Sequence, residues 1–324
     1  MSHFEVLNPG VLSLIQDTGR FGQSPLGLTN GGPLDAGSAR WANMLLANDA
    51  NASFIECSIG GLQLKAHCPA TFCVTGANLT VTVNGKARAM WQSHTVQSGD
   101  IIELGMASQG LRAYITVAGG FNITPQFGST ATVMREGIGG LNQNGAKLQA
   151  GDKLPLTATK AVPLRQLPAA LQPNFDFSNG LSLRLIEGYQ HQLFSSVERQ
   201  RFYFNTYKVT PKADRMGVKL SGPAISCSST SLLSEGICYG AVQIPPDGQP
   251  IVLLNDRQTL GGYPKIGSVL SLDCWLLAQA PAGTSLQFVK TDPQQAHNAL
   301  LLAQARFKRQ LASIKNPGGA ADDN

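Results

Sequence analysis

Short segments rich in β-branched residues, separated by turns that contain glycine, run through most of the chain. The segment at 71–90 reads TFCVTGANLTVTVNGKARAM and contains Asn84-Gly85, a dipeptide typical of a two-residue hairpin turn. Similar segments read LRAYITVAGGF at 111–121 and YGAVQIPPDGQPIVLLN at 239–255. Because 35 of the 324 residues are glycine and only 14% are charged, strands and turns are favoured over helices. The pattern predicts an all-β protein with few helices.

Two stretches have helical spacing instead. The first reads DAGSARWANMLLAN at 35–48 and follows Pro33, so Asp35 is the expected N-cap. In the second, near the C-terminus, apolar residues recur at three- and four-residue steps and predict an amphipathic helix: Leu300, Ala303, Phe307, Leu311 and Ile314. The final residues, GGAADDN, are expected to fray.

A cluster of prolines divides the chain into two β-rich halves. Its members are Pro155, Pro163, Pro168 and Pro173. This density disfavours both a helix interior and a central strand, and it predicts a linker. The expected organisation is an N-terminal β-barrel domain at 1–155, a linker at 156–178, a C-terminal β-barrel domain at 179–293, and a helix with a frayed tail at 294–324.

The composition argues against several classes of protein. The net charge of +5 is spread over scattered lysines and arginines, so nucleic-acid binding is not expected. No apolar run is long enough to span a membrane, and the N-terminal MSHFEVLNPG does not read as a secretory signal. The six cysteines show no metal-ligand spacing, which predicts free thiols and no metal site. We therefore expect a cytoplasmic protein without membrane contact.

The common catalytic and cofactor motifs are missing from the sequence. No G-x-x-x-x-G-K-[ST] loop and no G-x-G-x-x-G turn occurs, so no cofactor-binding residues are assigned. No G-x-S-x-G elbow occurs, and the five histidines are isolated along the chain. If the chain takes part in an ATP-driven reaction, we expect the nucleotide on another protein of the complex.

The stretch LLNDRQTLGGYPKIGSV, at 253–269, places many polar groups between two segments that read as buried. A simple turn does not need this polar density, and binding sites often lie on loops held by rigid strands. We expect the paired glycines to adopt positive φ angles and let a ligand approach the backbone. The candidate catalytic residues are Asp256, Tyr263 and Lys265, and the candidate binding residues are Arg257, Gln258, Thr259, Gly261 and Gly262.

Two further bends combine an acid with an arginine. Asp17 and Arg20 follow a strand-like run, and Asp214 and Arg215 precede Met216-Gly217. An arginine can grip a carboxylate with two parallel hydrogen bonds, so Arg20 and Arg215 are also candidate substrate-binding residues. The alternative is that both arginines form structural ion pairs, and the sequence leaves this open.

Five motifs resemble the allophanate hydrolase subunit 2 family. They read IQDTGRFG at 15–22, GGPLDAGSARWAN at 31–43, FIECSIGGLQL at 54–64, ADRMGVKLSG at 213–222, and SEGICYGAVQIPPDGQPIVLLNDRQTLGGYPKIG at 234–267. The last is long and highly specific. This family covers the biotin-dependent carboxyltransferase domain of urea carboxylases, the Kip-type antagonists of a kinase inhibitor, and the C subunit of bacterial ATP-hydrolysing 5-oxoprolinases.

The resemblance implies a fold and partners. Relatives are built from cyclophilin-like β-barrel modules, so two such domains are expected here. Relatives also work beside a smaller subunit or domain of the allophanate hydrolase subunit 1 family. In a 5-oxoprolinase complex, the expected partners are a protein of this type and a lactam-utilisation protein. The sequence carries no biotin-carboxylase or biotin-carrier region.

Three functions follow from the resemblance. The first is a component of a heteromeric hydrolase that opens the lactam of 5-oxo-L-proline to L-glutamate with ATP, active only with its partners. Under this hypothesis Arg257 or Arg215 would hold the substrate carboxylate, Asp256 would act as a base, and Lys265 would neutralise charge. The second is the carboxyltransferase component of a biotin-dependent urea or amide carboxylase, or subunit 2 of an allophanate hydrolase. Biotin is expected only under this second hypothesis. The third is a non-catalytic antagonist of a kinase inhibitor.

Overall fold

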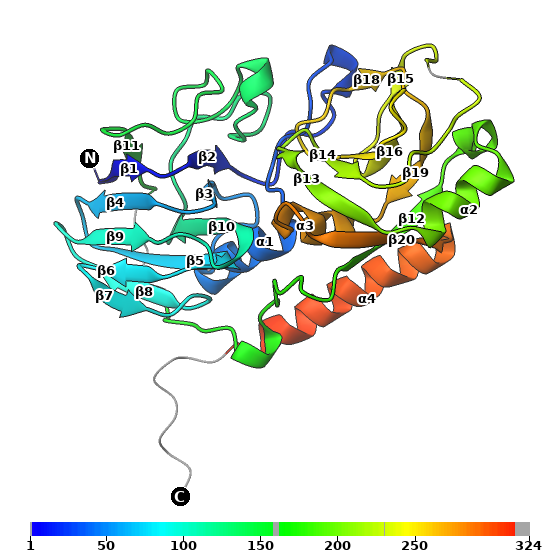
Figure 1. Ribbon diagram of the computed structural model, residues 1–324. Coiled ribbons are helices and arrows are strands. Elements are labelled where there is room, and N and C mark those ends of the chain that lie inside the picture. Colours follow the sequence, from blue (N-terminus) through cyan, green and yellow to red (C-terminus); the bar gives the residue numbers. More distant parts are fainter. Residues whose placement is uncertain (1, 158–161, 230, 315–324) are drawn as a thin grey trace, which may run out of the picture. The chain divides into compact units, whose positions relative to one another are not determined.

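The structure, a computed structural model, describes residues 2–157, 162–229 and 231–314. Strands dominate it, as Figure 1 shows, and this confirms the all-β prediction. The helices are α1 (Ala36–Leu45), α2 (Ser196–Phe204), α3 (Ser271–Gln279) and α4 (Pro293–Ala312), with short 3₁₀ turns η1 (Ser24–Leu26), η2 (Met134–Glu136), η3 (Ala169–Leu171) and η4 (Tyr189–Leu193). None of the helices among these residues is long and apolar enough to cross a bilayer. The tail that was expected to fray begins beyond the described residues.

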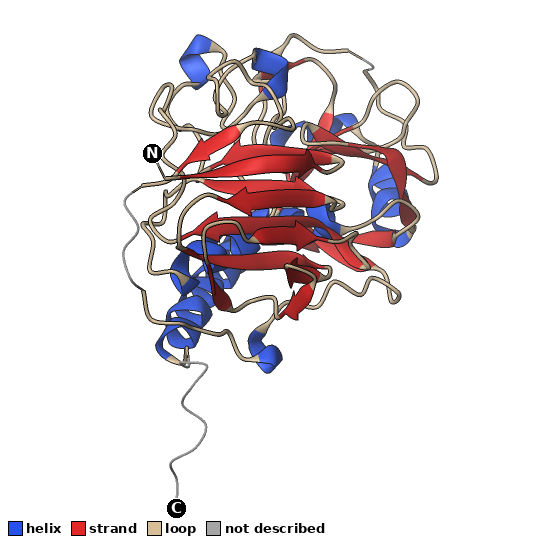
Figure 2. Ribbon diagram, turned by 90° about the vertical axis from the view of Figure 1, so that its left-hand side faces the viewer, coloured by secondary structure: helices blue, strands red, loops and turns tan. Residues whose placement is uncertain are grey.

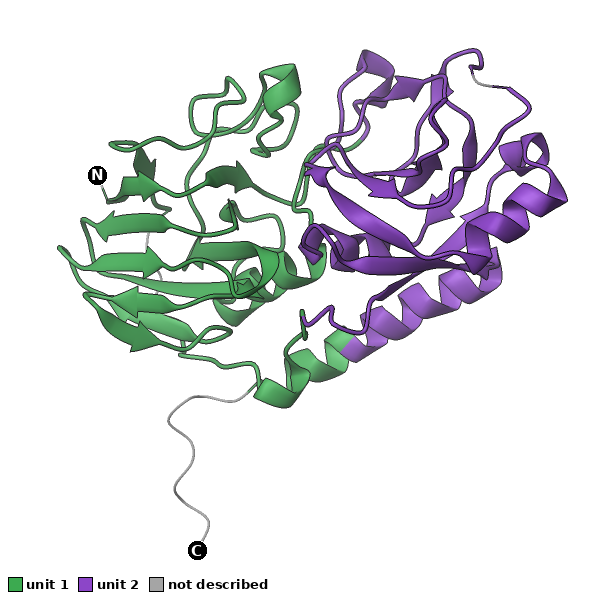
Figure 3. Cartoon of the chain, viewed as in Figure 1, with its two compact units in different colours: residues 1–21, 31–175, 307–324 green, residues 22–30, 176–306 purple. Residues whose placement is uncertain are grey.

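The chain divides into two compact units, which Figure 3 colours separately. Unit 1 comprises residues 1–21, 31–175 and 307–324, and unit 2 comprises residues 22–30 and 176–306. The predicted linker at 156–178 therefore contains the change of unit, between Phe175 and Asp176. The sequence did not indicate that 22–30 belongs with the second unit.

Unit 1 consists of two antiparallel sheets, whose strands are seen in Figure 2. The first sheet has the order β11 (Lys153–Pro155), β1 (His3–Pro9), β4 (Leu62–Ala66), β9 (Ile101–Leu104), β6 (Val81–Val83) and β7 (Lys86–Arg88). The second has the order β2 (Leu12–Gln16), β3 (Phe54–Ser58), β10 (Gln109–Val117), β5 (Ala70–Asn78) and β8 (Ser93–Val96). Side chains from both sheets, including Phe4, Phe72 and Ile115, form one apolar core.

Two local predictions in unit 1 are confirmed. Strands β6 and β7 pair as a hairpin, and Asn84 and Gly85 turn the chain with φ angles of 51° and 74°. These are the left-handed angles that a two-residue turn of this kind requires. Asp35 is the N-cap of α1, because its carboxylate accepts hydrogen bonds from the Ser38 amide at 3.0 Å and from the Ser38 hydroxyl at 2.6 Å.

Replacing Asp35 by alanine is expected to lower the free energy of unfolding of unit 1 by about 1–2 kcal/mol, because the amide at the start of α1 loses its acceptor. Urea unfolding followed by circular dichroism measures this change. Asp35→Asn is the matched variant, because it keeps a side-chain oxygen and should lose less. Equal stability of the alanine variant and the parent would contradict the capping role.

Unit 2 contains a closed barrel of seven strands. Their order is β12 (Leu181–Glu187), β19 (Lys265–Val269), β16 (Ala241–Gln243), β17 (Ile251–Leu253), β14 (Gly217–Ser221), β13 (Tyr207–Ala213) and β20 (Ser285–Thr291). Strands β12 and β20 close the barrel as a parallel pair, while the other pairs are antiparallel. Helix α2 packs on β20 through Phe202, which stacks on Phe288 with ring centroids 4.3 Å apart.

The predicted C-terminal helix is α4, and its last turns carry the expected apolar anchor. Phe307 is 9% exposed. The Arg40 guanidinium lies 3.6 Å from the centroid of its ring, and Trp41 packs against it at 4.5 Å between centroids. These contacts explain why residues from Phe307 onward count with unit 1.

Candidate functional site

The polar stretch at 253–269 connects three strands of unit 2. Strand β17 ends at Leu253, β18 (Leu260–Gly261) pairs with β15 (Glu235–Gly236), and β19 begins at Lys265. The stretch therefore leaves the barrel after one strand, forms a two-stranded ladder, and returns to the barrel in the next. This route places side chains from both ends of the stretch on rigid strands, a frequent arrangement for binding loops.

The prediction of positive φ angles at Gly261 and Gly262 is wrong, because neither residue lies in the left-handed region. Both positions need glycine for space. A Cβ at Gly261 would lie 2.5 Å from Ile237 Cδ1 and 3.1 Å from Gln243 Nε2. A Cβ at Gly262 would lie 2.6 Å from the Leu232 carbonyl oxygen. Close packing against side chains and backbone, and not turn geometry, therefore explains the glycine pair.

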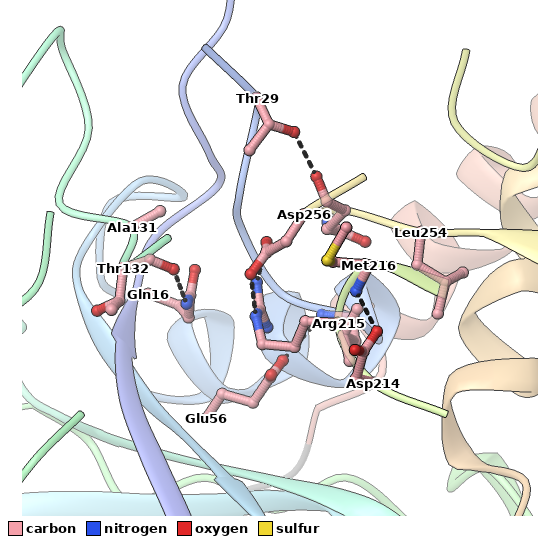
Figure 4. A network of polar contacts seen from close by, with 12 residues as sticks. Gln16, Thr29, Glu56, Ala131, Thr132, Asp214, Arg215, Met216, Leu254 and Asp256 are labelled. Carbon is pink, nitrogen blue, oxygen red and sulfur yellow. Dashed lines mark hydrogen bonds and ion pairs between the residues drawn. The ribbon is translucent and has the colours of Figure 1, made fainter. Parts of the chain in front are cut away.

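Arg215 and Asp256 form a buried, two-pronged ion pair, shown in Figure 4. Arg215 Nε donates to Asp256 Oδ2 at 2.8 Å, and Nη2 donates to Oδ1 at 2.9 Å. Both residues are at most 6% exposed. Asp214, the neighbour in sequence, accepts instead from the Met216 and Gly217 amides at 2.8 and 3.1 Å. Asp256, the predicted base, and Arg215, a residue predicted to bind the substrate carboxylate, are thus bound to each other.

Lys265 is at the centre of a second polar cluster. Its ammonium group donates to Glu235, and its backbone amide donates to Gln190 Oε1 at 2.8 Å. Gln190 Nε2 and the Tyr189 hydroxyl also donate to the Glu235 carboxylate. The hydrogen bond from Lys265, followed by that from Tyr189, lowers the pKa of Glu235. The same contact with Glu235 raises the pKa of the Tyr189 hydroxyl.

Arg257 and Thr259 contact the backbone of unit 2. Arg257 Nε donates to the Ile237 carbonyl at 3.1 Å and Nη1 to the Leu254 carbonyl at 3.2 Å. Its partial burial lowers the pKa of the guanidinium. Thr259 Oγ1 donates to the Gly27 carbonyl at 3.4 Å. Arg257 was predicted to bind a ligand. Its side chain instead stabilises the polar stretch through these backbone contacts.

Arg20 belongs to unit 1, whereas the polar stretch belongs to unit 2. It is 1% exposed, and its Nη2 donates to the Ala131 carbonyl at 2.9 Å. Asp17 accepts from the Ser129 hydroxyl and from the Thr130 amide, each at 2.6 Å. These bonds connect the bend at 17–20 to the segment at 129–131. Arg20 and Asp17 therefore have a structural role in unit 1.

A pocket of about 520 Å³ opens beside β13, β14 and β17 of unit 2, a size within the range of small-molecule sites. Two predicted residues, Gln258 and Tyr263, line it. The full lining is Pro211, Lys212, Ala213, Asp214, Met216, Gly217, Lys219, Gln243, Ile251, Leu253, Gln258 and Tyr263. The remaining predicted residues of the stretch do not line this pocket.

The sequence did not indicate two polar residues of this lining, Gln243 and Lys212. Gln243 is 2% exposed, and its Nε2 has no hydrogen-bond partner among the residues that the structure describes. Lys212 makes no ion pair within the same ranges, whereas Lys219 pairs with Asp247. The motif at 234–267 contains Gln243, but within an apolar run that reads as a plain strand. No group of three metal-ligating side chains occurs in the described part of the chain.

Comparison with known proteins identifies the family. The family model for the carboxyltransferase domain, subdomain A and B, matches residues 26–290. The chain belongs to the carboxyltransferase-domain family. This confirms the resemblance that the five motifs indicate.

Relatives within the carboxyltransferase-domain family differ in length. The 5-oxoprolinase C subunit of Escherichia coli (strain K12) is 33% identical over 95% of this chain and 97% of that protein. The protein of the same name from Haemophilus influenzae is 33% identical over 90% of this chain and 92% of its own length. The crystal structure of the Kluyveromyces lactis urea amidolyase superposes with a TM-score of 0.88 at 26% identity, covering 95% of this chain. The match spans only 20% of that larger chain.

Proposed function

We propose that this chain is the C subunit of an ATP-dependent 5-oxoprolinase, a complex that opens 5-oxo-L-proline to L-glutamate. The observation that supports this proposal most strongly is the share of each relative's own length that this chain matches. The 5-oxoprolinase C subunit of Escherichia coli is covered over 97% of its length, whereas the urea amidolyase is covered over 20%. This chain thus matches nearly the whole of the first protein and only one part of the second.

The chemistry of lactam opening fits the groups that unit 2 presents. A lactam carbonyl is a poor electrophile, so a site that opens it must orient the ring and place hydrogen-bond donors at the carbonyl oxygen. The unit 2 pocket offers the amide of Gln258, the phenol of Tyr263 and the ammonium group of Lys212. Asp256 and Arg215, which bind each other, hold the stretch that carries Gln258 and Tyr263.

The complex requires partners for the rest of the reaction. The sequence contains no glycine-rich phosphate loop, so we assign ATP to a partner protein. The proposed partners are a protein of the allophanate hydrolase subunit 1 type and the lactam-utilisation protein. The six cysteines are free thiols, which supports a complex that works in the reducing cytoplasm.

Omitting this chain from the reconstituted complex is expected to abolish ATP hydrolysis that depends on 5-oxo-L-proline. The test combines the two purified partner proteins with and without this chain and measures phosphate and glutamate. Adding the purified chain back should restore turnover in proportion to its concentration. Undiminished turnover by the two partners alone would contradict the proposal.

A second candidate is the carboxyltransferase component of a biotin-dependent urea or amide carboxylase. The TM-score of 0.88 to the Kluyveromyces lactis urea amidolyase supports it. Here the chain would take a carboxyl group from biotin on a separate carrier protein. Carboxylation of urea by this chain, when a biotin carboxylase and a biotinylated carrier are supplied, would favour this candidate over the first.

A further inference from the structure

Residues 232–237 and 259–263 form a small flap of unit 2 around the ladder of β15 and β18 (Figure 1). The ladder contains two residue pairs. The outer side of the flap is open to solvent, because Leu233 is 93% exposed and Leu260 is 60% exposed. A two-stranded ladder this short has little stability of its own. The position of the flap must therefore come from the groups that connect it to the barrel.

One end of the flap is anchored by apolar packing and by backbone bonds. Ile237 is 6% exposed and packs with Ala241 and Leu253 in a small apolar cluster of unit 2. Its amide donates to the Thr259 carbonyl at 2.9 Å, and its carbonyl accepts from Arg257 Nε at 3.1 Å. This end therefore stays in place as long as the barrel is folded.

The opposite end of the flap is connected to the barrel by a carboxylate. Here the Leu232 amide donates to the Gly262 carbonyl at 2.8 Å, and both residues are partly exposed. The connecting side chain is that of Glu235. Its carboxylate accepts from three donors outside the flap: the Tyr189 hydroxyl, Gln190 Nε2 at 2.6 Å, and the Lys265 ammonium group.

The donors to this carboxylate belong to a rigid part of the barrel. Strand β19 contains a β-bulge at Ile266, where its register against β16 shifts. On one side of the bulge, the Lys265 amide donates to Gln190 Oε1 at 2.8 Å. At the bulge itself, the Ile266 carbonyl accepts from the Gly188 amide at 3.1 Å. Because a bulge changes the direction of nearby side chains, it explains why Lys265 points to Glu235.

Tyr263 connects the flap to the unit 2 pocket. It follows Gly262 directly, lines the pocket and is 42% exposed. The next residue, Pro264, is buried, and its carbonyl accepts from the Ile244 amide at 2.9 Å. A movement of this end of the flap therefore reaches Tyr263 and stops at Pro264. The part of the pocket wall that Tyr263 forms depends on the position of the flap.

We propose that the flap is a lid on the unit 2 pocket and that the Glu235 carboxylate is its latch. When the latch is formed, Tyr263 stays in the pocket wall. When it is broken, the latched end moves outward about the anchor at Ile237. A lid that closes after a ligand has entered shields the ligand from water. The inference rests on contacts within unit 2 and does not depend on the proposed reaction.

Hydrogen exchange of the full chain, followed by mass spectrometry with single-residue fragmentation, tests the latch. Glu235→Gln keeps the shape of the side chain and removes its charge and one acceptor oxygen. The Leu232 amide is expected to exchange about 10- to 100-fold faster, whereas the Ile237 amide should not change. Asp247→Asn is the matched control, because it breaks an exposed ion pair with Lys219 outside the flap. This control should leave both amides unchanged.

Fluorine NMR of the chain labelled with fluorotyrosine tests whether the latch acts on the pocket. The Tyr263 resonance is assigned with Tyr263→Phe. In Glu235→Gln this resonance is expected to shift or broaden, whereas that of Tyr114, which is buried in unit 1, should be unchanged. Tyr189→Phe removes one of the three donors to the carboxylate and should have a smaller effect in both experiments.

Two results would overturn the inference. If the Leu232 and Ile237 amides respond equally to Glu235→Gln, or if neither responds, Glu235 does not hold one end of a flap. If only the Leu232 amide responds and the Tyr263 resonance is unchanged, the flap opens without moving the pocket wall and is not a lid on this pocket. The reconstitution tests the proposed function separately, so either idea can fail while the other stands.

Discussion

Replacing Asp256 by alanine is expected to lower the free energy of unfolding of unit 2 by about 3–5 kcal/mol. The reason is that the Arg215 guanidinium, on a residue only 6% exposed, would lose both oxygens that it bonds at 2.8 and 2.9 Å. Removing one member of a buried ion pair is among the most destabilising changes that one substitution can make. The loss is larger than the expected cost of removing the Asp35 cap.

Hydrogen exchange followed by mass spectrometry suits this measurement, because the two units need not unfold together. Amides of β14 and β17, which flank the pair in sequence, should exchange faster in Asp256→Ala. Amides of the β6–β7 hairpin in unit 1 should be unchanged and serve as the internal control.

The double variant Arg215→Met with Asp256→Leu tests whether the loss of stability comes from breaking the ion pair or from losing the volume of the two side chains. It replaces two charges by apolar side chains of similar size, so it should be less destabilised than either single variant. If Asp256→Ala unfolds like the parent and loses only activity, Asp256 is a catalytic base, as the sequence analysis predicted. The structural role assigned here to the ion pair of Arg215 and Asp256 would then be contradicted.

Local sequence patterns predicted local structure well. The Asn84-Gly85 turn and the Asp35 cap are confirmed because each depends on residues within a few positions of one another. The polar stretch at 253–269 was also located correctly as the connection between two barrel strands. In these cases backbone geometry and hydrogen bonding at one turn decide the structure, and tertiary packing does not override them.

The partners of charged side chains could not be predicted in the same way. Arg215 follows Asp214 directly, but its two-pronged partner is Asp256, on the loop after another strand of the barrel. Antiparallel pairing of β14 with β17 brings these positions together, and strand order is a property of the whole barrel. Arg257 likewise bonds to backbone carbonyls that strand packing supplies.

Gln243 shows why the pocket was missed. Its neighbours in sequence are apolar, so the residue reads as part of a buried strand, and its burial agrees with that reading. The informative property is the unpaired nitrogen, which depends on the atoms around Gly261 and on the course of β18. Only the three-dimensional arrangement shows that Gln243 and Gln258 line the same pocket.

Removing the carboxylate of Glu235 is expected to change how the stability of unit 2 depends on pH. Lys265 and Tyr189 lower the pKa of Glu235 below its ordinary value of 4.5. The ionised form is therefore favoured by folding, and its contribution is complete above the unfolded pKa. This contribution is lost as the pH falls through the lower, folded value.

Glu235→Gln keeps the shape of the side chain and removes this titration. Measured by urea unfolding from pH 7 to pH 3, the parent should lose more stability below pH 4.5 than the variant does. At pH 7 the variant should be less stable by about 1.5–3 kcal/mol, because the Lys265 ammonium, on a residue 9% exposed, loses its charged acceptor.

Lys265→Met combined with Glu235→Gln decides what Lys265 does. If Lys265 serves only the ion pair, the double variant should recover part of the stability lost in Glu235→Gln and assemble into an active complex. If it recovers stability but turnover of 5-oxo-L-proline falls to background, Lys265 acts on the substrate, as the sequence analysis predicted. Parallel pH curves for the parent and Glu235→Gln would show that Glu235 does not bond to Lys265 in solution.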